Sequence, residues 1–351
     1  MTLHLENVEL AFDKLCVLNS INLTVETGEF VCLLGPSGCG KTSTLRVCAG
    51  LETPKKGRVI VDDVVMTDGN KVMAPEKRQI GFLFQDFALF PHLNVYHNVA
   101  FGLKGWKKAD IDDRVFEVLK QVRMDKYAKA LPHQLSGGQQ QRIALARAMA
   151  PKPKIILLDE PFSGLDSGLR AEIRDETLHV LKTSNVAAVM VTHDPEEAMF
   201  MADRIVLMKA GNIVQDGTPS ELYANPVDHF AASFFGEVNT LKGVIQNNQA
   251  KTILGYVPAE GFREGEKVDV LVRPQNIKIQ TITDQIKPTE QAHIEAARYL
   301  GRESLLHIRL ENGSGESTHI HARVEGHRLP EENESIMAVM DYEHALVFRA
   351  S

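Results

Sequence analysis

An eight-residue stretch near the N-terminus, GPSGCGKT at residues 35–42, constrains this chain more than any other feature. It matches the pattern G-x-x-x-x-G-K-[ST], in which the backbone N–H groups of a glycine-rich loop surround phosphate groups. The apolar run 30–34 precedes it and a helix-favouring segment, 43–47, follows, so we expect a buried strand, the loop and then a helix. A glycine-rich turn before a helix is the alternative, but the Lys-Thr ending favours phosphate binding.

The residue types within this loop each suit a phosphate ligand. The three glycines allow a sharp turn that aims N–H groups inward, and the helix start adds the positive end of its dipole. Lys41 can reach the β- and γ-phosphates, and the Thr42 hydroxyl can bind Mg²⁺. The predicted site comprises Gly35, Pro36, Ser37, Gly38, Cys39, Gly40, Lys41, Thr42 and Ser43.

Composition limits what else the chain can be. Its 351 residues suggest two domains, and 44% hydrophobic residues are enough for real cores. The net charge of −7 gives no indication of a nucleic-acid partner. The four cysteines form no C-x-x-C pair, which predicts reduced thiols in a cytosol rather than a disulfide framework or zinc site. Cys39 is either a thiolate favoured by nearby positive charge or, as we expect, a small filler residue.

No targeting or membrane-spanning segment is visible in the sequence. The first eight residues alternate like a strand and lack the charged and apolar regions of a signal peptide. No apolar run approaches the ~20 residues that a helix needs to cross a bilayer. If the protein works at a membrane, we expect another chain to hold it there.

Two carboxylates follow a continuous apolar run at residues 155–158. Such a run is typical of a parallel strand buried on both faces, and the carboxyl end of that strand would lie beside the phosphate loop. Asp159 suits Mg²⁺ coordination, and Glu160 suits a general base. A pair of acidic residues beginning a turn is the alternative.

Two further polar residues end apolar runs in the same way. Gln85 follows the run 80–84, and His193 follows the run 187–191. At strand ends they would face the same crevice, where Gln85 could bind the metal or orient a water and His193 could sense the γ-phosphate. A solvated glutamine and a structural histidine are the alternatives.

A second phosphate-receptive helix start occurs in LSGGQQQR, residues 135–142. Ser136 is a plausible N-cap, and Gly137 and Gly138 expose backbone N–H groups. The chain therefore has two helix starts that suit a phosphate, but only the first has the Lys-Thr ending.

The rest of the chain changes character after Gly236. Before it we expect short strands over 3–31, helices over 94–148, a hairpin around residues 210–212 and a helical stretch over 220–235. Residues 237–351 predict an all-β domain, a small barrel. The strands expected there are 242–245, 252–257, 267–272, 304–310, 319–324 and 335–340.

His319 and His321 would share one face of a strand in this region. A metal site there is possible, but a solvated strand is the favoured interpretation. Phe12, near the end of the first strand, is either core packing or a ring that stacks on a nucleotide base.

Together these motifs resemble the ATP-binding subunit of ABC transporters. They occur in the order GPSGCGKT, Gln85, LSGGQQQR, ILLDE, SGLD and His193, and LSGGQ is specific to that family. The resemblance covers residues 1–236 and implies an α/β P-loop NTPase fold with a helical subdomain at about 86–148, and ATP and Mg²⁺ as ligands.

The family pattern also implies roles for individual residues. Phe12 matches the aromatic that stacks on adenine, which is usually tyrosine. The implied roles are Gln85 as the Q-loop and a Mg²⁺ ligand, Asp159-Glu160 as the Walker B end, Asp166 as the D-loop and His193 as the switch histidine.

Resemblance to this family implies a homodimer in which each ATP lies between the P-loop of one subunit and the loop Ser136, Gly137, Gly138 and Gln139 of the other. It also implies integral-membrane permease subunits, indirect coupling to a periplasmic solute-binding protein, and a position at the cytoplasmic face of a bacterial inner membrane.

The C-terminal region, 237–351, resembles the OB-type TOBE domain of bacterial importer ATPases. The segments LDEPFSGLD and Val272-Arg273-Pro274-Gln275 look most like the ferric-iron branch, which predicts iron as the cargo. Import of sulfate, a polyamine or a sugar is the alternative, followed by a soluble ABC ATPase that acts outside transport.

Overall fold

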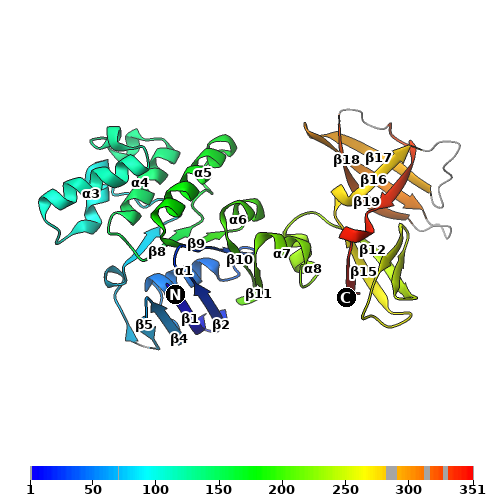
Figure 1. Cartoon of the computed structure of the whole chain (residues 1–351), viewed down its shortest axis with the longest axis horizontal. Coiled ribbons are helices and arrows are strands. Elements are labelled where there is room, and N and C mark those ends of the chain that lie inside the picture. Colours follow the sequence, from blue (N-terminus) through cyan, green and yellow to red (C-terminus); the bar gives the residue numbers. More distant parts are fainter. Residues whose placement is uncertain (1, 70, 282–290, 312–316, 327–330, 351) are drawn as a thin grey trace. The chain divides into compact units, whose positions relative to one another are not determined.

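The computed structural model describes residues 2–69, 71–281, 291–311, 317–326 and 331–350. It divides into two compact units, residues 1–222 and 223–351, whose chain can be followed in Figure 1. This division lies earlier than the predicted boundary at residue 236. The reason is that the chain just after Leu222 contacts the β-rich part, as in the hydrogen bond from Arg273 Nη2 to Tyr223 O at 3.3 Å.

A six-stranded sheet forms the centre of the first unit, in the order β11-β10-β3-β9-β8-β7. Five of these strands are parallel, and β11 pairs antiparallel with β10. Every residue of β3, β8 and β9 is buried, as expected for strands covered on both faces. The strands are β3 (Phe30–Leu34), β7 (Ile80–Leu83), β8 (Ile155–Asp159), β9 (Ala187–Thr192), β10 (Arg204–Lys209) and β11 (Asn212–Gly217).

A second, antiparallel sheet of the first unit has the order β2-β1-β4-β5-β6. One cluster of buried side chains joins it to the central sheet and to the helix after the phosphate loop, for example through Leu5, Val47 and Val189. The strands are β1 (Leu3–Phe12), β2 (Leu15–Val25), β4 (Lys56–Val61), β5 (Val64–Asp68) and β6 (Lys71–Val72).

Helices surround the central sheet and form a helical segment after β7, as predicted for residues 94–148. In Figure 1, α3, α4 and α5 lie near one another, and α4 contacts α2, α3 and α5. The helices of the first unit are α1 (Lys41–Ala49), α2 (Val95–Ala100), α3 (Lys108–Gln121), α4 (Gly137–Met149), α5 (Ser167–Ser184) and α6 (Pro195–Met201). In the predicted helical stretch 220–235, α7 (Pro219–Ala224) spans the division between the units and α8 (His229–Phe234) belongs to the second unit.

Two five-stranded sheets form the second unit and share one hydrophobic core. The all-β prediction is confirmed, but the described strands pair as two separate sheets rather than as the single barrel that we expected. Their orders are β14-β13-β12-β15-β21 and β16-β20-β17-β18-β19. The strands are β12 (Asn239–Gln246), β13 (Gln249–Thr252), β14 (Gly255–Pro258), β15 (Lys267–Val272), β16 (Ile277–Thr281), β17 (Gln291–Tyr299), β18 (Glu303–Glu311), β19 (Ser317–Glu325), β20 (Ser335–Met340) and β21 (Leu346–Arg349).

The predicted strand 252–257 is a hairpin instead, formed by β13 and β14. The Thr252 hydroxyl accepts a hydrogen bond from Leu254 N at 3.1 Å and donates one to Gly255 O at 2.9 Å. Gly255 has a φ of +113°, which glycine adopts readily. The Thr252 side chain therefore stabilises a tight turn inside a run that reads as one strand.

Arg78, between a 3-10 helix (Pro75–Lys77) and β7, is fully buried in the first unit. All five of its N–H donors have acceptors, and burial lowers the pKa of its guanidinium. Two of the acceptors are carbonyls in the last turn of α1, where the helix dipole also favours a cation. The acceptors are Met73 O, Val47 O, Cys48 O, Met66 O and Thr67 Oγ1, at 2.8 to 3.3 Å.

We predict that Arg78→Leu lowers the free energy of unfolding by about 3 kcal/mol, because several buried acceptors lose their donor at once. Urea unfolding followed by circular dichroism measures the change. Lys77→Leu is the matched control, because Lys77 is exposed and adjacent. Equal midpoints for Arg78→Leu and the parent would show that the guanidinium does not hold α1 to the segment before β7.

Candidate functional site

The glycine-rich loop leaves the buried end of β3 and turns into α1. Gly35 has a φ of +153°, and a Cβ there would lie 2.2 Å from the carbonyl oxygen of Met208 on β10. Gly40, with a φ of +103°, is the N-cap of α1. Only glycine satisfies both the conformation and the space at Gly35, so the close packing of β3 on β10 fixes where the loop begins.

Lys41 is buried at the first position of α1 and folds back over the loop. Its Nζ donates to Gly35 O at 2.7 Å and to Pro36 O at 3.0 Å, and lies 3.8 Å from Cys39 Sγ. The Lys41 ammonium is therefore held within the loop, at the position where phosphate oxygens would bind.

Burial disfavours the thiolate form of the cysteine in the loop. Cys39 is buried, and burial raises the pKa of its thiol despite the opposing effect of Lys41. Desolvation of the charged form thus exceeds the attraction of the neighbouring ammonium, and Cys39 is the small filler residue that we favoured. The four cysteines are all free.

Thr42 and Asp159 meet where α1 begins and β8 ends. The Thr42 hydroxyl donates to Asp159 Oδ1 at 2.8 Å. Burial raises the pKa of Asp159, and the hydrogen bond from Thr42 acts in the opposite direction. A hydroxyl and a carboxylate this close supply the hard oxygen donors that Mg²⁺ prefers, so the residues present fit that ion.

Glu160 and His193 come together at the ends of β8 and β9. Glu160 N donates to Val191 O at 3.0 Å, which continues the pairing of the two strands. Glu160 has a φ of +43°, in the left-handed region. Its Oε1 lies 3.4 Å from His193 Nδ1, and His193 is half exposed. A strained backbone at the strand end thus aims a carboxylate at an accessible imidazole.

Two neighbouring pockets collect the predicted crevice residues. One is lined by Thr42, Gln85 and Asp159, together with Arg46, Phe84, Asp86, Ser163 and Gly164. The other contains Glu160 and His193, with Ser163, Arg170, Thr192, Asp194 and Glu197. The fold therefore brings Gln85 to the Thr42–Asp159 pair, as expected for residues at strand ends.

Sequence reasoning missed several residues that line these pockets. Arg46 lies one turn after Thr42 on α1, a spacing that could have placed it on the same side of the helix. Glu197 is buried, and it accepts a hydrogen bond from Thr192 Oγ1 at 2.7 Å. No sequence signal distinguishes Glu197 from the other acids that begin α6.

The LSGGQ loop is a capped helix start, as predicted. Ser136 Oγ accepts from Gln139 N at 3.3 Å, and Gln139 Oε1 accepts from Ser136 N at 3.0 Å. This capping box fixes the entry into α4. Among the described residues, those that line the two crevice pockets do not include positions 136–139.

Glycine at position 137 is not required by the packing of the chain itself. A Cβ there would meet only Leu165 Cδ2, at an ordinary 3.6 Å. At Gly138 a Cβ would lie 3.0 Å from Leu169 Cδ2, which is tight. The loop thus packs on the segment that contains Asp166, the N-cap of α5, whose Oδ1 accepts from Leu169 N at 3.0 Å.

Phe12 is exposed at the end of β1, with 48% of its surface accessible. The core-packing interpretation is therefore wrong, and stacking on a base stays a prediction.

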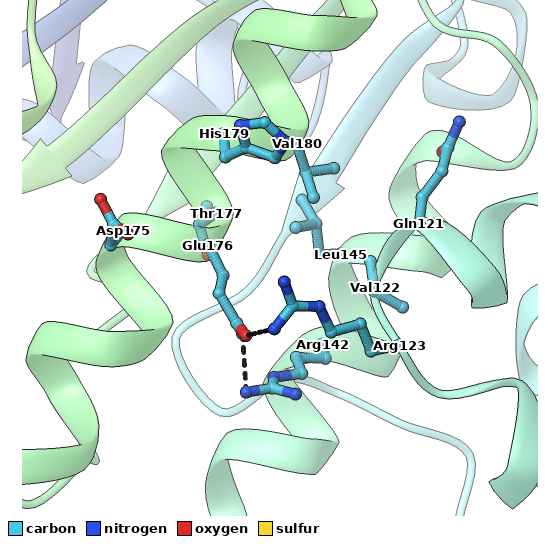
Figure 2. Close-up of a pocket in the computed structure, with 10 residues that line it drawn as sticks. All are labelled: Gln121, Val122, Arg123, Arg142, Leu145, Asp175, Glu176, Thr177, His179 and Val180. Carbon is cyan, nitrogen blue, oxygen red and sulfur yellow. Dashed lines mark hydrogen bonds and ion pairs between the residues drawn. The ribbon is translucent and has the colours of Figure 1, made fainter.

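A separate pocket lies between the helical segment and α5 (Figure 2). Glu176 of α5 pairs there with Arg123 at 3.1 Å and with Arg142 of α4 at 2.6 Å. None of the predicted site residues lines it, so we interpret it as the junction at which α5 holds the helical segment.

Comparison with known proteins agrees with these motifs. A family model described as ABC transporter matches residues 18–163. The spermidine/putrescine import ATP-binding protein PotA of Lawsonia intracellularis is 42% identical over 324 residues, which cover 89% of this chain and 87% of that protein. The chain belongs to the ABC transporter ATP-binding family. It is therefore an ATPase that binds ATP.

Other relatives carry the same name. PotA of Acetivibrio thermocellus is 45% identical over 286 residues, 80% of each chain, and PotA of Vibrio cholerae is 40% identical over 89% of this chain and 84% of its own. The ferric-iron branch predicted from the sequence is thus not supported. Two short segments carried the iron prediction, whereas the likeness to the spermidine/putrescine import proteins extends over 80 to 89% of the chain.

Solved structures share the fold over 62 to 64% of this chain. A dimeric ATP-binding cassette in a post-hydrolysis state, bound to ADP and Pi, is 34% identical with a TM-score of 0.55, covering 62% of this chain and 98% of its own. CbiO1 of Clostridium perfringens, part of an ABC transporter complex, is 29% identical with a TM-score of 0.59, covering 64% and 91%. In the described part of this chain, no helix combines the length and apolar character needed to cross a membrane.

Proposed function

We propose that this chain hydrolyses ATP to energise import of a polyamine through a membrane ABC transporter. The main support for this proposal is the crevice beside the glycine-rich loop, which is formed by Thr42, Asp159, Glu160 and His193. It combines a loop suited to binding phosphate with a carboxylate, that of Glu160, in position to act as a general base. The relatives named as spermidine/putrescine import proteins support the cargo. The similarity to PotA of Lawsonia intracellularis covers 89% of this chain, so it includes much of the β-rich region as well as the ATP-binding part.

ATP is the substrate of the proposed reaction, and the loop residues bind its phosphates. Lys41 would exchange its contacts with Gly35 O and Pro36 O for phosphate oxygens. Thr42, Asp159 and Gln85 would hold Mg²⁺, which when bound neutralises charge on the phosphates. The exposed ring of Phe12 would stack on the adenine.

Glu160 is the proposed general base. It accepts a proton from the water whose oxygen bonds to the γ-phosphorus, while the bond from that phosphorus to the β–γ bridging oxygen breaks. His193, 3.4 Å from Glu160, would orient the carboxylate and contact the γ-phosphate. Asp159 accepts the hydrogen bond from Thr42, so the proposal assigns different roles to the two adjacent carboxylates: Asp159 binds the metal ion and Glu160 is the base.

The LSGGQ loop is proposed to complete the site of a second copy of the chain. Its exposed Ser136 and Gly137 and its helix start suit a phosphate, yet they line neither crevice pocket of their own chain. Gly137 has room for a side chain, so the glycine leaves space for something outside the chain. The ATP of a partner, clamped in a homodimer, meets this requirement.

The partners follow from this role. The helical segment and Gln85 would transmit ATP-driven closure to integral-membrane permease subunits, and a solute-binding protein would deliver the polyamine to them. The chain would then be peripheral, at the cytoplasmic face of the membrane. The β-rich second unit is proposed to be a TOBE-type domain.

We predict that Glu160→Gln lowers ATP turnover at least ~100-fold while leaving ATP affinity nearly unchanged, because an amide cannot accept the proton but fills the same space. Equilibrium binding and phosphate release are measured on the same preparation. Glu196→Gln, an exposed acid on α6, is the control and should resemble the parent. Normal turnover in Glu160→Gln would remove Glu160 from the catalytic role.

We predict that cells lacking this chain lose uptake of labelled spermidine or putrescine, and that the parent gene restores it while Glu160→Gln does not. Sulfate, maltose and ferric iron serve as comparison cargoes. Restoration of one of those instead would reject the polyamine assignment and keep the importer. If the parent hydrolyses ATP but its loss changes no uptake, the ATPase role outside transport is the correct one.

A further inference from the structure

Three histidines meet on the outer face of a sheet in the second unit. His307 of β18 lies directly opposite His321 of β19, and His319 lies two residues before His321 on the same face. Ligand atoms of the three rings lie within 4.8 Å of one another. The neighbouring residues Ile308 and Ile320 are buried in the core. Because side chains alternate along a strand, the three rings lie on the opposite, outer face.

Two of the three rings each contact a carboxylate through their Nδ1 atom. Glu295 Oε2 lies 2.8 Å from His319 Nδ1, and Glu237 Oε1 bonds to His321 Nδ1. Glu295 is the extra residue of a bulge, because Ile294 pairs with Ile308 and Ala296 pairs with His307. A bulge redirects a side chain, and here the carboxylate reaches the histidine face.

Buried Asn239 fixes the position of His321. Its Nδ2 donates to His321 O at 2.8 Å, and its Oδ1 accepts from His321 N at 2.7 Å. Asn239 begins β12, only two residues after Glu237, so the same contact also places the carboxylate. Backbone and ring of His321 are thus both positioned before any ligand binds.

The Nε2 atoms of His319 and His321 face each other. If each Nδ1–H donates to its carboxylate, the Nε2 atoms of neutral His319 and His321 are both acceptors, yet they lie 3.1 Å apart. Two lone pairs at this distance need a cation between or beside them. An added proton is one answer, and a metal ion is the other.

We propose that His307, His319 and His321 bind a divalent first-row transition-metal ion such as Zn²⁺. Two nitrogens on a tetrahedral zinc, with Zn–N bonds of about 2.0–2.1 Å, lie about 3.3 Å apart, close to the 3.1 Å between the two Nε2 atoms. Imidazole ligands suit Zn²⁺, Ni²⁺ or Cu²⁺ rather than Mg²⁺ or Ca²⁺.

The surroundings complete this assignment. A carboxylate on the second nitrogen of a metal-binding histidine sets its tautomer and raises its basicity. His319 is exposed, and His307 and His321 are partly so, which leaves room for a water or another ligand in a fourth position. Arg309 and Arg323 lie 3.7 Å from the same two carboxylates, so the acids are oriented from both sides.

Zinc titration of the full chain, stripped of metal and without nucleotide, tests the proposal. Cys16→Ser serves as the background, because Cys16 is exposed and could bind zinc itself. Isothermal titration should give one Zn²⁺ per chain in this background, and Co²⁺ should give visible d–d bands. His319→Gln and His321→Gln should each abolish this binding, whereas His344→Gln, an exposed histidine elsewhere in the unit, should not.

Glu295→Gln separates a built site from three histidines that are merely close. Loss of its charge should weaken Zn²⁺ binding about 10-fold or more without removing it. Circular dichroism of each variant checks folding, and His307→Gln is the substitute if His321→Gln unfolds. If the histidine variants and the background bind Zn²⁺ equally, or if the background binds none, the proposal is wrong. Neither outcome bears on the ATP site.

Discussion

The hydrogen bond between Thr42 and Asp159 ties the first unit together at its functional edge. It joins the start of α1 to the end of β8, two segments that lie more than a hundred positions apart in the sequence. Because α1 also packs into the core between the two sheets, the phosphate loop cannot move without disturbing that core. The glycine at position 35, pressed against the Met208 carbonyl, secures the other end of the loop.

Much of this arrangement could be predicted because buried parallel strands are recognisable in the sequence as continuous apolar runs. β3, β8 and β9 are buried on both faces, so each appears in the sequence as an unbroken apolar run, and the polar residues at or just after the ends of β8 and β9 line the crevice. Asp159, Glu160 and His193 were found in this way. Arg78 was not, because its partners are almost all backbone carbonyls, which a sequence does not reveal.

The second unit was harder to predict for a related reason. Antiparallel strands depend on cross-strand register, and register depends on turns that follow no strong local rule, such as the Thr252 turn. The spacing of His319 and His321 showed that they share a face, but only the pairing of β18 with β19 brings His307 to them.

In the proposed function, the LSGGQ loop acts on the ATP of another copy of the chain. Sizing by light scattering, with ATP and without Mg²⁺, tests it on a Glu160→Gln background, in which closed dimers should accumulate. Ser136→Arg and Lys41→Ala subunits should each remain monomeric alone, and their mixture should partly recover dimers, because one heterodimer site then has both an intact P-loop and an intact LSGGQ loop. The control is His133→Arg, because His133 is exposed and close to the loop in sequence; this variant should dimerise like the parent. Dimerisation of Ser136→Arg alone to the level of the parent would contradict the account.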